Sequence, residues 1–284
     1  MDANPVRSQP EPSYRAYWGL EDSSFRALPD PKLFYQSATH EEALARLHFL
    51  VDDRRRLAIL LGEQGSGKSM LLQVFARELR RKGRQVVLLG LIGVSGLDLL
   101  WNLAAQFGLD PSPGDSLLRS WRVVVDRFVE NRCQQIHTVI LLDDAGNAED
   151  DALSNLIRLA QADPVPESCL TFVLAADTDR CQGLGERLWD LCQWRIELER
   201  WESSDTADYV ASMLAKSGCE QSPFAPPALT RLHELADGLP RRVSQLADLA
   251  LLEGANKRLD QIDERTVEMA HRELVKNGKT PVAP

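Results

Sequence analysis

The sequence of 284 residues lacks several patterns that would assign it to a particular class of protein. No stretch approaches the roughly 18 consecutive apolar residues of a membrane-spanning helix, so none is expected. The first 20 residues also lack the apolar core of a secretory signal. The five cysteines are odd in number and include no C-x-x-C pair, which argues against a zinc ribbon and against a disulfide framework. Free thiols favour a reducing, cytoplasmic compartment.

Basic residues are fewer than acidic residues. The chain has 33 Lys and Arg against 42 Asp and Glu, a net charge of −9. An acidic surface repels phosphate backbones, so nonspecific binding to nucleic acid is possible but not favoured. Two basic runs, 54–56 and 80–82, leave a local contact open, although charges at helix ends usually meet only solvent. The five histidines are dispersed and have no metal-ligating spacing.

Short apolar runs alternate with helical patterns through the first 200 residues. This alternation predicts an α/β fold in which right-handed β-α-β crossovers form a parallel five-stranded sheet with helices on both faces. A helix with Leu44, Leu47 and Leu50 on one face comes first, and Thr39 and Glu42 form its predicted capping box. The expected strands are 57–61, 85–89, 138–142, 170–175 and 195–198, and the helices between them 68–81, 97–107, 116–132, 149–161 and 180–191.

A change of pattern near Trp201 indicates a second domain. Helices are expected from Ser203 and over 227–236, 240–255 and 263–274. The predicted organisation is an N-terminal arm at 1–36, partly disordered, a core at 37–200, an all-helical domain at 201–276 and a flexible tail at 277–284. The aromatic part of the arm is expected to lie on a folded surface.

The strongest motif lies between the first strand and the following helix. Gly62-Glu63-Gln64-Gly65-Ser66-Gly67-Lys68-Ser69 matches G-x-x-x-x-G-K-[ST], the phosphate-binding loop. Glycines let successive N–H groups point inward at a phosphate, and the helix start adds its positive dipole end. Lys68 reaches the β- and γ-phosphates, and the Ser69 hydroxyl coordinates magnesium. ATP with Mg²⁺ is therefore expected at Gly62, Glu63, Gln64, Gly65, Ser66, Gly67, Lys68, Ser69 and Met70.

A second motif ends the third strand. The run Val139 to Leu142 leads into Asp143 and Asp144, the Walker-B arrangement. Asp143 would complete the magnesium shell. Asp144 is the expected base for the attacking water, although it could instead cap the next helix.

Several stretches together resemble the ExeA-type (general secretion pathway A) AAA+ ATPases, relatives of the TniB-like transposition ATPases. They are the arm motif from Phe25 to Leu47, then GEQGSGKS, VILLDDAGN and GLPRRVSQLADLAL. The resemblance covers most of residues 14–275. It implies an ATPase core with a helical lid, and ATP bound between neighbouring subunits of an oligomer.

The resemblance also implies residue roles and shows departures from the pattern. Arg241 in Gly238-Leu239-Pro240-Arg241 matches the arginine that senses the γ-phosphate from the lid. The family usually has Asp-Glu where this chain has Asp143-Asp144, so slow turnover is expected. Thr178 is a loose candidate for the polar γ-phosphate sensor after the fourth strand. No clean match to the arginine finger exists, and Arg187 and Arg195 are the nearest arginines; either could instead form a surface ion pair. Phe34 and Tyr35 could line an adenine pocket or pack in the core.

The expected function is magnesium-dependent ATP binding and hydrolysis, with Lys68, Asp144 and Arg241 as catalytic residues. The nucleotide state would be coupled to lid movement and to assembly of a homo-oligomer. The process served stays open between a secretion-type ATPase, a DNA-associated adaptor of the transposition kind, and a signalling switch with little turnover. The sequence does not identify the protein partner.

Overall fold

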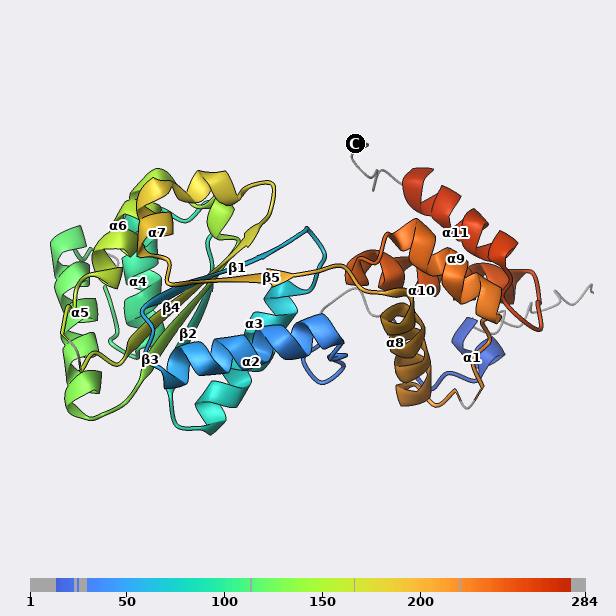
Figure 1. The fold of residues 1–284 in the computed structure, drawn as a ribbon, viewed down its shortest axis with the longest axis horizontal. Coiled ribbons are helices and arrows are strands. Elements are labelled where there is room, and N and C mark those ends of the chain that lie inside the picture. Colours follow the sequence, from blue (N-terminus) through green and yellow to red (C-terminus); the bar gives the residue numbers. More distant parts are fainter. Residues whose placement is uncertain are drawn as a thin grey trace, which may run out of the picture. The chain divides into compact units, whose positions relative to one another are not determined.

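A computed structural model describes residues 14–22, 25, 30–112, 114–165, 167–219 and 221–276. They form two compact units (Figure 1). The α/β unit consists of residues 30–199. The helical unit combines residues 200–276 with the described part of the segment before residue 30. The predicted disorder of the first dozen residues and the predicted flexible tail lie outside the described residues.

The α/β unit is built on one parallel sheet with the strand order β2-β3-β4-β1-β5. Every neighbouring pair of strands is parallel, which confirms the predicted five-stranded parallel sheet. The strands are β1 (Leu57–Gly62), β2 (Gln85–Gly90), β3 (Thr138–Asp143), β4 (Leu170–Asp177) and β5 (Trp194–Leu198).

Both faces of this sheet are covered, as the continuous apolar character of the strands predicts. Successive side chains of β1 enter different cores: Ile59 packs under α4 to α7, and Leu60 packs under α2 and α3. The helices on these two faces are α2 (Ala38–Asp52), α3 (Lys68–Arg81), α4 (Gly96–Gln106), α5 (Leu117–Cys133), α6 (Asp150–Ala160) and α7 (Glu186–Leu191).

Two local predictions are wrong. Helix α2 begins one residue after Ser37, which occupies the N-cap position, so Thr39 is not the cap. The Thr39 hydroxyl instead accepts a hydrogen bond of 3.1 Å from the Glu199 N–H. The helix predicted over 180–191 is divided into η2 (Cys181–Leu184) and α7. Gly185 separates them at φ 75°, a left-handed conformation that ends a right-handed helix.

The helical unit contains α8 (Ser203–Lys216), α9 (Pro226–Ala236), α10 (Pro240–Asn256) and α11 (Glu264–Lys276). A short helix from the N-terminal segment, α1 (Tyr14–Trp18), packs against α10. The Tyr14 hydroxyl donates to Asp248 at 2.9 Å, and the Trp18 indole N–H donates to the Leu251 carbonyl at 2.8 Å. Burial raises the pKa of Asp248, while the bond from Tyr14 partly offsets that effect. Tyr14 and Trp18 thus belong to the helical unit, whereas the later aromatic residues of the predicted arm, Phe34 and Tyr35, belong to the α/β unit.

Within the described ranges, no helix combines the length and the apolar character needed to cross a membrane.

Candidate functional site

The loop between β1 and α3 has the backbone that a phosphate-binding loop requires. Gly65 and Gly67 have φ values of 92° and 100°, which residues with a side chain rarely adopt. Gly62 has no room for a side chain, because a Cβ there would lie 2.5 Å from the Ser66 hydroxyl oxygen. The loop begins as a tight turn in which the Ser66 N–H donates to the Glu63 carbonyl at 3.1 Å. The predicted glycine pattern therefore corresponds to real steric demands.

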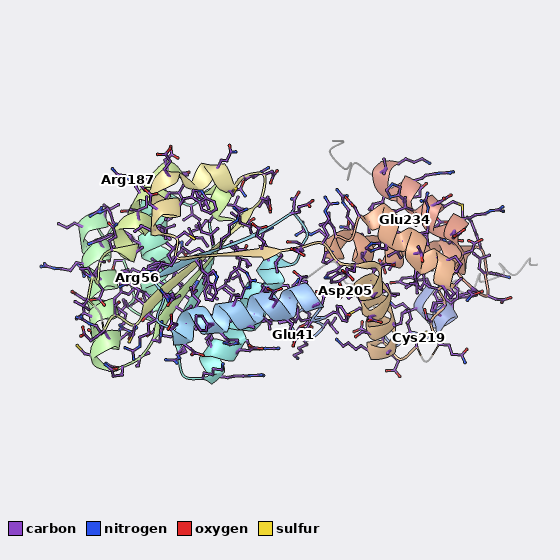
Figure 2. The ribbon with its side chains drawn as sticks, viewed as in Figure 1. Glu41, Arg56, Arg187, Asp205, Cys219 and Glu234 are labelled. Atoms are coloured by element: carbon purple, nitrogen blue, oxygen red, sulfur yellow. The ribbon has the colours of Figure 1, made fainter. Side chains whose placement is uncertain are left out.

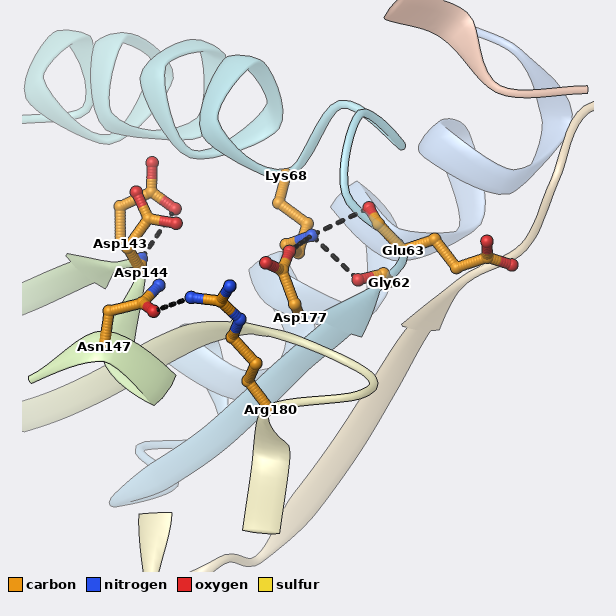
Figure 3. A network of polar contacts seen from close by, with 8 residues as sticks. All are labelled: Gly62, Glu63, Lys68, Asp143, Asp144, Asn147, Asp177 and Arg180. Atoms are coloured by element: carbon orange, nitrogen blue, oxygen red, sulfur yellow. Dashed lines mark hydrogen bonds and ion pairs between the residues drawn. The ribbon is translucent and has the colours of Figure 1, made fainter. Parts of the chain in front are cut away.

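Lys68 is the first residue of α3, and its side chain turns back into the loop (Figure 3). The ammonium donates to the carbonyl oxygens of Gly62 at 2.8 Å and Glu63 at 2.9 Å, and to a carboxylate oxygen of Asp177 at 2.8 Å. Only 6% of the Lys68 side chain is exposed. The positive charge is therefore held in the loop at a fixed place.

The strand order explains why Asp177 meets Lys68. Strands β1 and β4 are neighbours, and Gly62 is paired with Asp177 in their register. Asp177 thus ends β4 where β1 enters the loop. Sequence reasoning proposed Thr178 as a polar residue here, and this stays a prediction: its side chain is exposed, and its N–H donates to the Gly62 carbonyl at 3.2 Å. The signal for Asp177 was its place as the last residue of an apolar strand.

Asp143 and Asp144 lie at the same edge of the sheet, at the end of β3 (Figure 3). Both are half-buried. The Asp144 N–H donates to the Asp143 carboxylate at 3.0 Å, which fixes the direction of that carboxylate. Asp144 has φ 54° and ψ 36°, a left-handed conformation that aspartate tolerates better than most residues. Its structural role is to begin the short helix η1 (Ala145–Asn147).

A contact between loops completes this edge. Arg180 lies after β4 and Asn147 lies after β3, and the Arg180 guanidinium donates to the Asn147 side chain (Figure 3). The two loops approach each other so closely that a Cβ on Gly146 would lie 2.9 Å from the Arg180 carbonyl oxygen. Sequence reasoning did not find either Arg180 or Asn147. Their contact ties together the loops that carry Asp144 and Asp177.

The residues present fit a bound phosphate with magnesium. The Ser66 hydroxyl is buried inside the loop with no hydrogen-bond partner among the described residues, so it is free to donate to an anion. The Ser69 hydroxyl and the Asp143 carboxylate are hard oxygen donors of the kind that Mg²⁺ prefers. Magnesium usually keeps several waters and takes one or two side chains plus phosphate oxygens, which suits this donor set.

The other predicted residues lie away from this cluster or in the helical unit. Arg195 pairs with Glu197 at 2.5 Å, and Arg187 is exposed on α7 (Figure 2). Neither has a contact with the loop among the described hydrogen bonds and ion pairs. Phe34 packs against the core formed by α2 and α3, and Tyr35 is half-buried.

Arg241 is exposed at the start of α10, whereas its neighbour Arg242 is half-buried. Gly238 fixes the turn before this helix: its carbonyl accepts from the Trp201 N–H at 2.9 Å, and a Cβ would lie 2.5 Å from the Trp201 carbonyl oxygen.

Comparison with known proteins identifies a matching family model and a similar protein. Residues 51–182 match the family model described as "AAA domain". General secretion pathway protein A of Aeromonas hydrophila is 28% identical over 243 residues, which is 84% of this chain and 44% of that protein. The chain thus spans less than half the length of this curated relative.

Among solved structures, the ORC2 protein of Aeropyrum pernix in its ADPNP-ADP complexes has a TM-score of 0.65 at 16% identity, covering 89% of this chain and 72% of that chain. The ORC1 protein of the same organism in complex with DNA has a TM-score of 0.64 at 18% identity, with coverages of 93% and 70%. The RuvB branch migration motor of Thermotoga maritima has a TM-score of 0.59 at 15% identity, with coverages of 85% and 73%. At identities this low, the TM-scores establish the fold alone. The chain has the P-loop AAA+ fold, residues 51–182 match the AAA domain model, and 84% of the chain is similar to General secretion pathway protein A.

Proposed function

We propose that the chain binds ATP with magnesium at the loop 62–69 and hydrolyses it. The observation that carries the proposal is Lys68: a buried ammonium at the start of a helix, held by two loop carbonyls and one carboxylate. Because this ammonium already donates to a carboxylate oxygen, it can donate to a phosphate oxygen in the same way. The unpartnered Ser66 hydroxyl and the left-handed glycines support the same ligand.

Phosphoryl transfer mainly requires positioning and charge neutralisation. Lys68 and the N–H groups of the loop would hold the phosphates. Magnesium held by Ser69 and Asp143 would neutralise charge on the phosphate oxygens. Asp144 would accept a proton from the attacking water, and the Arg180–Asn147 contact would keep its loop in place.

Turnover is proposed to be slow, which makes a switch with little hydrolysis a second candidate function. Aspartate is shorter than glutamate by one C–C bond, about 1.5 Å. A displacement of about 1 Å can reduce a rate on the order of 100-fold. The left-handed backbone of Asp144 favours this reading, because a helix-starting role already accounts for aspartate at this position.

The biological role is also part of the proposal. The similarity to General secretion pathway protein A favours a secretion-type ATPase. We infer that it works in the cytoplasm, forms an ATP-dependent homo-oligomer and acts through a protein partner. A DNA-associated adaptor is the alternative, and the net charge of −9 does not favour it. ATPase rate and oligomer size, each measured with and without duplex DNA, would separate the two. Stimulation or assembly by DNA would reject the first role.

Lys68→Ala tests nucleotide binding, with Lys82→Ala as the matched control because Lys82 is exposed just beyond the other end of α3. A charge-assisted hydrogen bond contributes about 1.5–3 kcal/mol, so Lys68→Ala should weaken ATP binding at least roughly tenfold in calorimetry. Lys82→Ala should bind ATP like the wild type. Equal affinities of Lys68→Ala and wild type would reject the assignment of the loop.

A further inference from the structure

His40 contacts the phosphate-binding loop on the side that faces α2. It lies in the first turn of α2 and is 2% exposed. Its Nδ1 shares a hydrogen bond of 2.7 Å with the Ser37 hydroxyl, and its Nε2 lies 3.1 Å from the Ser66 carbonyl oxygen. A carbonyl oxygen can only accept, so the partners assign the proton to Nε2. A side chain of α2 thus holds a carbonyl of the loop.

The ring also fills the space behind Gly67. A Cβ on Gly67 would lie 2.6 Å from His40 Nε2. On the other side, Phe34 meets the imidazole edge-to-face with ring centroids 5.4 Å apart. The ring is therefore held between Phe34 and the loop, and the loop backbone cannot move towards α2 without displacing it.

This contact determines where the Gly67 N–H points. In a trans peptide the C=O and the following N–H point in opposite directions. Since the Ser66 carbonyl is directed at His40, the Gly67 N–H is directed away from His40. In a loop of this kind, inward-pointing N–H groups bind the phosphates.

We propose that His40 is a positioning residue: by holding the Ser66 carbonyl, it aims the Gly67 N–H at the phosphate group of the nucleotide. This inference rests on the proposed function. It predicts that His40 affects the affinity for nucleotide phosphates more than any other buried histidine of the unit does.

His137 provides a matched control in the same unit. It is also 2% exposed, and its Nε2 lies 2.9 Å from the Thr171 hydroxyl. That hydroxyl donates to the Arg55 carbonyl and therefore accepts from His137. The contact lies where β3 and β4 begin, at the opposite edge of the parallel sheet from the loop. Removing the His137–Thr171 contact should lower the stability of the fold without disturbing the phosphate-binding loop.

The experiment compares ATP and ADP affinities, by calorimetry with Mg²⁺ at a temperature where every variant is folded. His40→Leu and His40→Asn both lose the bond to Ser66, the asparagine because its amide is too short. Each should weaken both nucleotides by roughly tenfold, the effect of one lost phosphate contact. His40→Gln can donate from its longer amide to Ser66 and should recover most of the affinity. His137→Leu should melt at a lower temperature yet bind within about twofold of wild type.

The outcomes distinguish the inference from the proposed function. A wild type that binds neither nucleotide would overturn both. A wild type that binds, with His40→Leu and His40→Asn binding equally well, would overturn the role of His40 alone. Equal losses in His137→Leu, or no recovery in His40→Gln, would show that only general stability was affected and would also overturn it.

Discussion

Lys68 and Asp177 form a close ion pair at 2.8 Å, with side chains only 6% and 12% exposed. The carboxylate stabilises the buried ammonium, but its negative charge would also repel a phosphate. Asp177→Asn keeps an oxygen for Lys68 and removes that charge. We therefore expect a lower melting temperature together with an affinity for ATP that is several-fold tighter, on the order of 1 kcal/mol. Calorimetry and thermal unfolding measure the two effects.

The control for Asp177 is Asp179→Asn, because Asp179 is exposed two residues further along the chain. It should leave both quantities close to those of the wild type. Weaker ATP binding in Asp177→Asn would mean that the carboxylate helps to bind the nucleotide, directly or by placing Lys68.

A substitution of Asp144 should separate ATP binding from ATP hydrolysis. Asp144→Asn retains a residue type that tolerates the left-handed backbone but cannot accept a proton. It should bind ATP normally and lose turnover by roughly 10²–10⁴-fold, the usual size of a general-base contribution. Phosphate release under saturating ATP measures the loss, and an unchanged rate would remove Asp144 from the mechanism.

Asp144→Glu tests the length of the carboxylate at the same position. Glutamate should raise the rate if the shorter side chain limits turnover. It should also lower stability by roughly 1 kcal/mol, because it fits the left-handed conformation less well. A rate below that of the wild type would show that the site is built around aspartate.

His137 makes stability depend on pH. Burial, reinforced by the positive charges of Arg84 and Arg54, lowers the pKa of His137 to about 4 from 6.5. The unfolded chain therefore binds a proton at this residue between those values while the folded chain does not, so stability falls as the pH falls from 6.5 to 4. His137→Leu lacks this effect. The stability advantage of the wild type over the variant should shrink by up to about 3 kcal/mol across that range, as measured by urea unfolding; a constant advantage would contradict the lowered pKa.

At the level of secondary structure, the strands and most helices were predictable to within one or two residues. Apolar runs such as 138–142 are too short for helices and too apolar for surface strands. The exceptions were 180–191, where Gly185 interrupts the helix, and the short helix α1, which was not predicted. The glycine pattern of the loop likewise predicted the place of Lys68.

What the sequence could not provide was the neighbour of each strand. The place of β4 beside β1 brings Asp177 to Lys68, and the packing of α2 against the loop brings His40 to Ser66. Both contacts join segments distant in the chain, and local periodicity carries no information about such pairings. The sequence predicted that the aromatic N-terminal residues lie on a folded surface, and for the same reason it could not identify α10 as that surface.

The close packing of α1 on α10 can be tested because it should reverse the usual effect of a Gly→Ala substitution on stability. Gly→Ala inside a helix normally stabilises by about 1 kcal/mol. In α10, however, a Cβ on Gly254 would lie 2.9 Å from the Trp18 ring. Gly254→Ala should therefore be neutral or destabilising in the wild type and more favourable in a Trp18→Ala background. Denaturant unfolding of the four proteins measures the coupling, and additive effects would show that α1 does not pack there in solution.

For the whole molecule, Arg241 tests the proposal that the helical unit responds to the nucleotide. Arg241 is exposed at the start of α10, on a turn fixed by Gly238. If this arginine senses the γ-phosphate, Arg241→Ala should weaken ATP binding and any ATP-dependent oligomer while leaving ADP affinity nearly unchanged. Calorimetry with each nucleotide and light scattering measure these quantities. Arg242→Ala is the control, and equal losses for ATP and ADP would mark Arg241 as structural.

The helical unit is assembled from both ends of the chain, and this has a consequence for synthesis on the ribosome. Residues 30–199 are contiguous and can fold as they emerge. Tyr14, Tyr17 and Trp18 emerge 233–242 residues before their partners Asp248, Leu251 and Leu259. At about 5–20 residues per second, these aromatic side chains wait roughly ten to fifty seconds for their binding surface. During that interval they are exposed to chaperones and to neighbouring nascent chains, so this aromatic segment is open to misassembly until α10 has been synthesised.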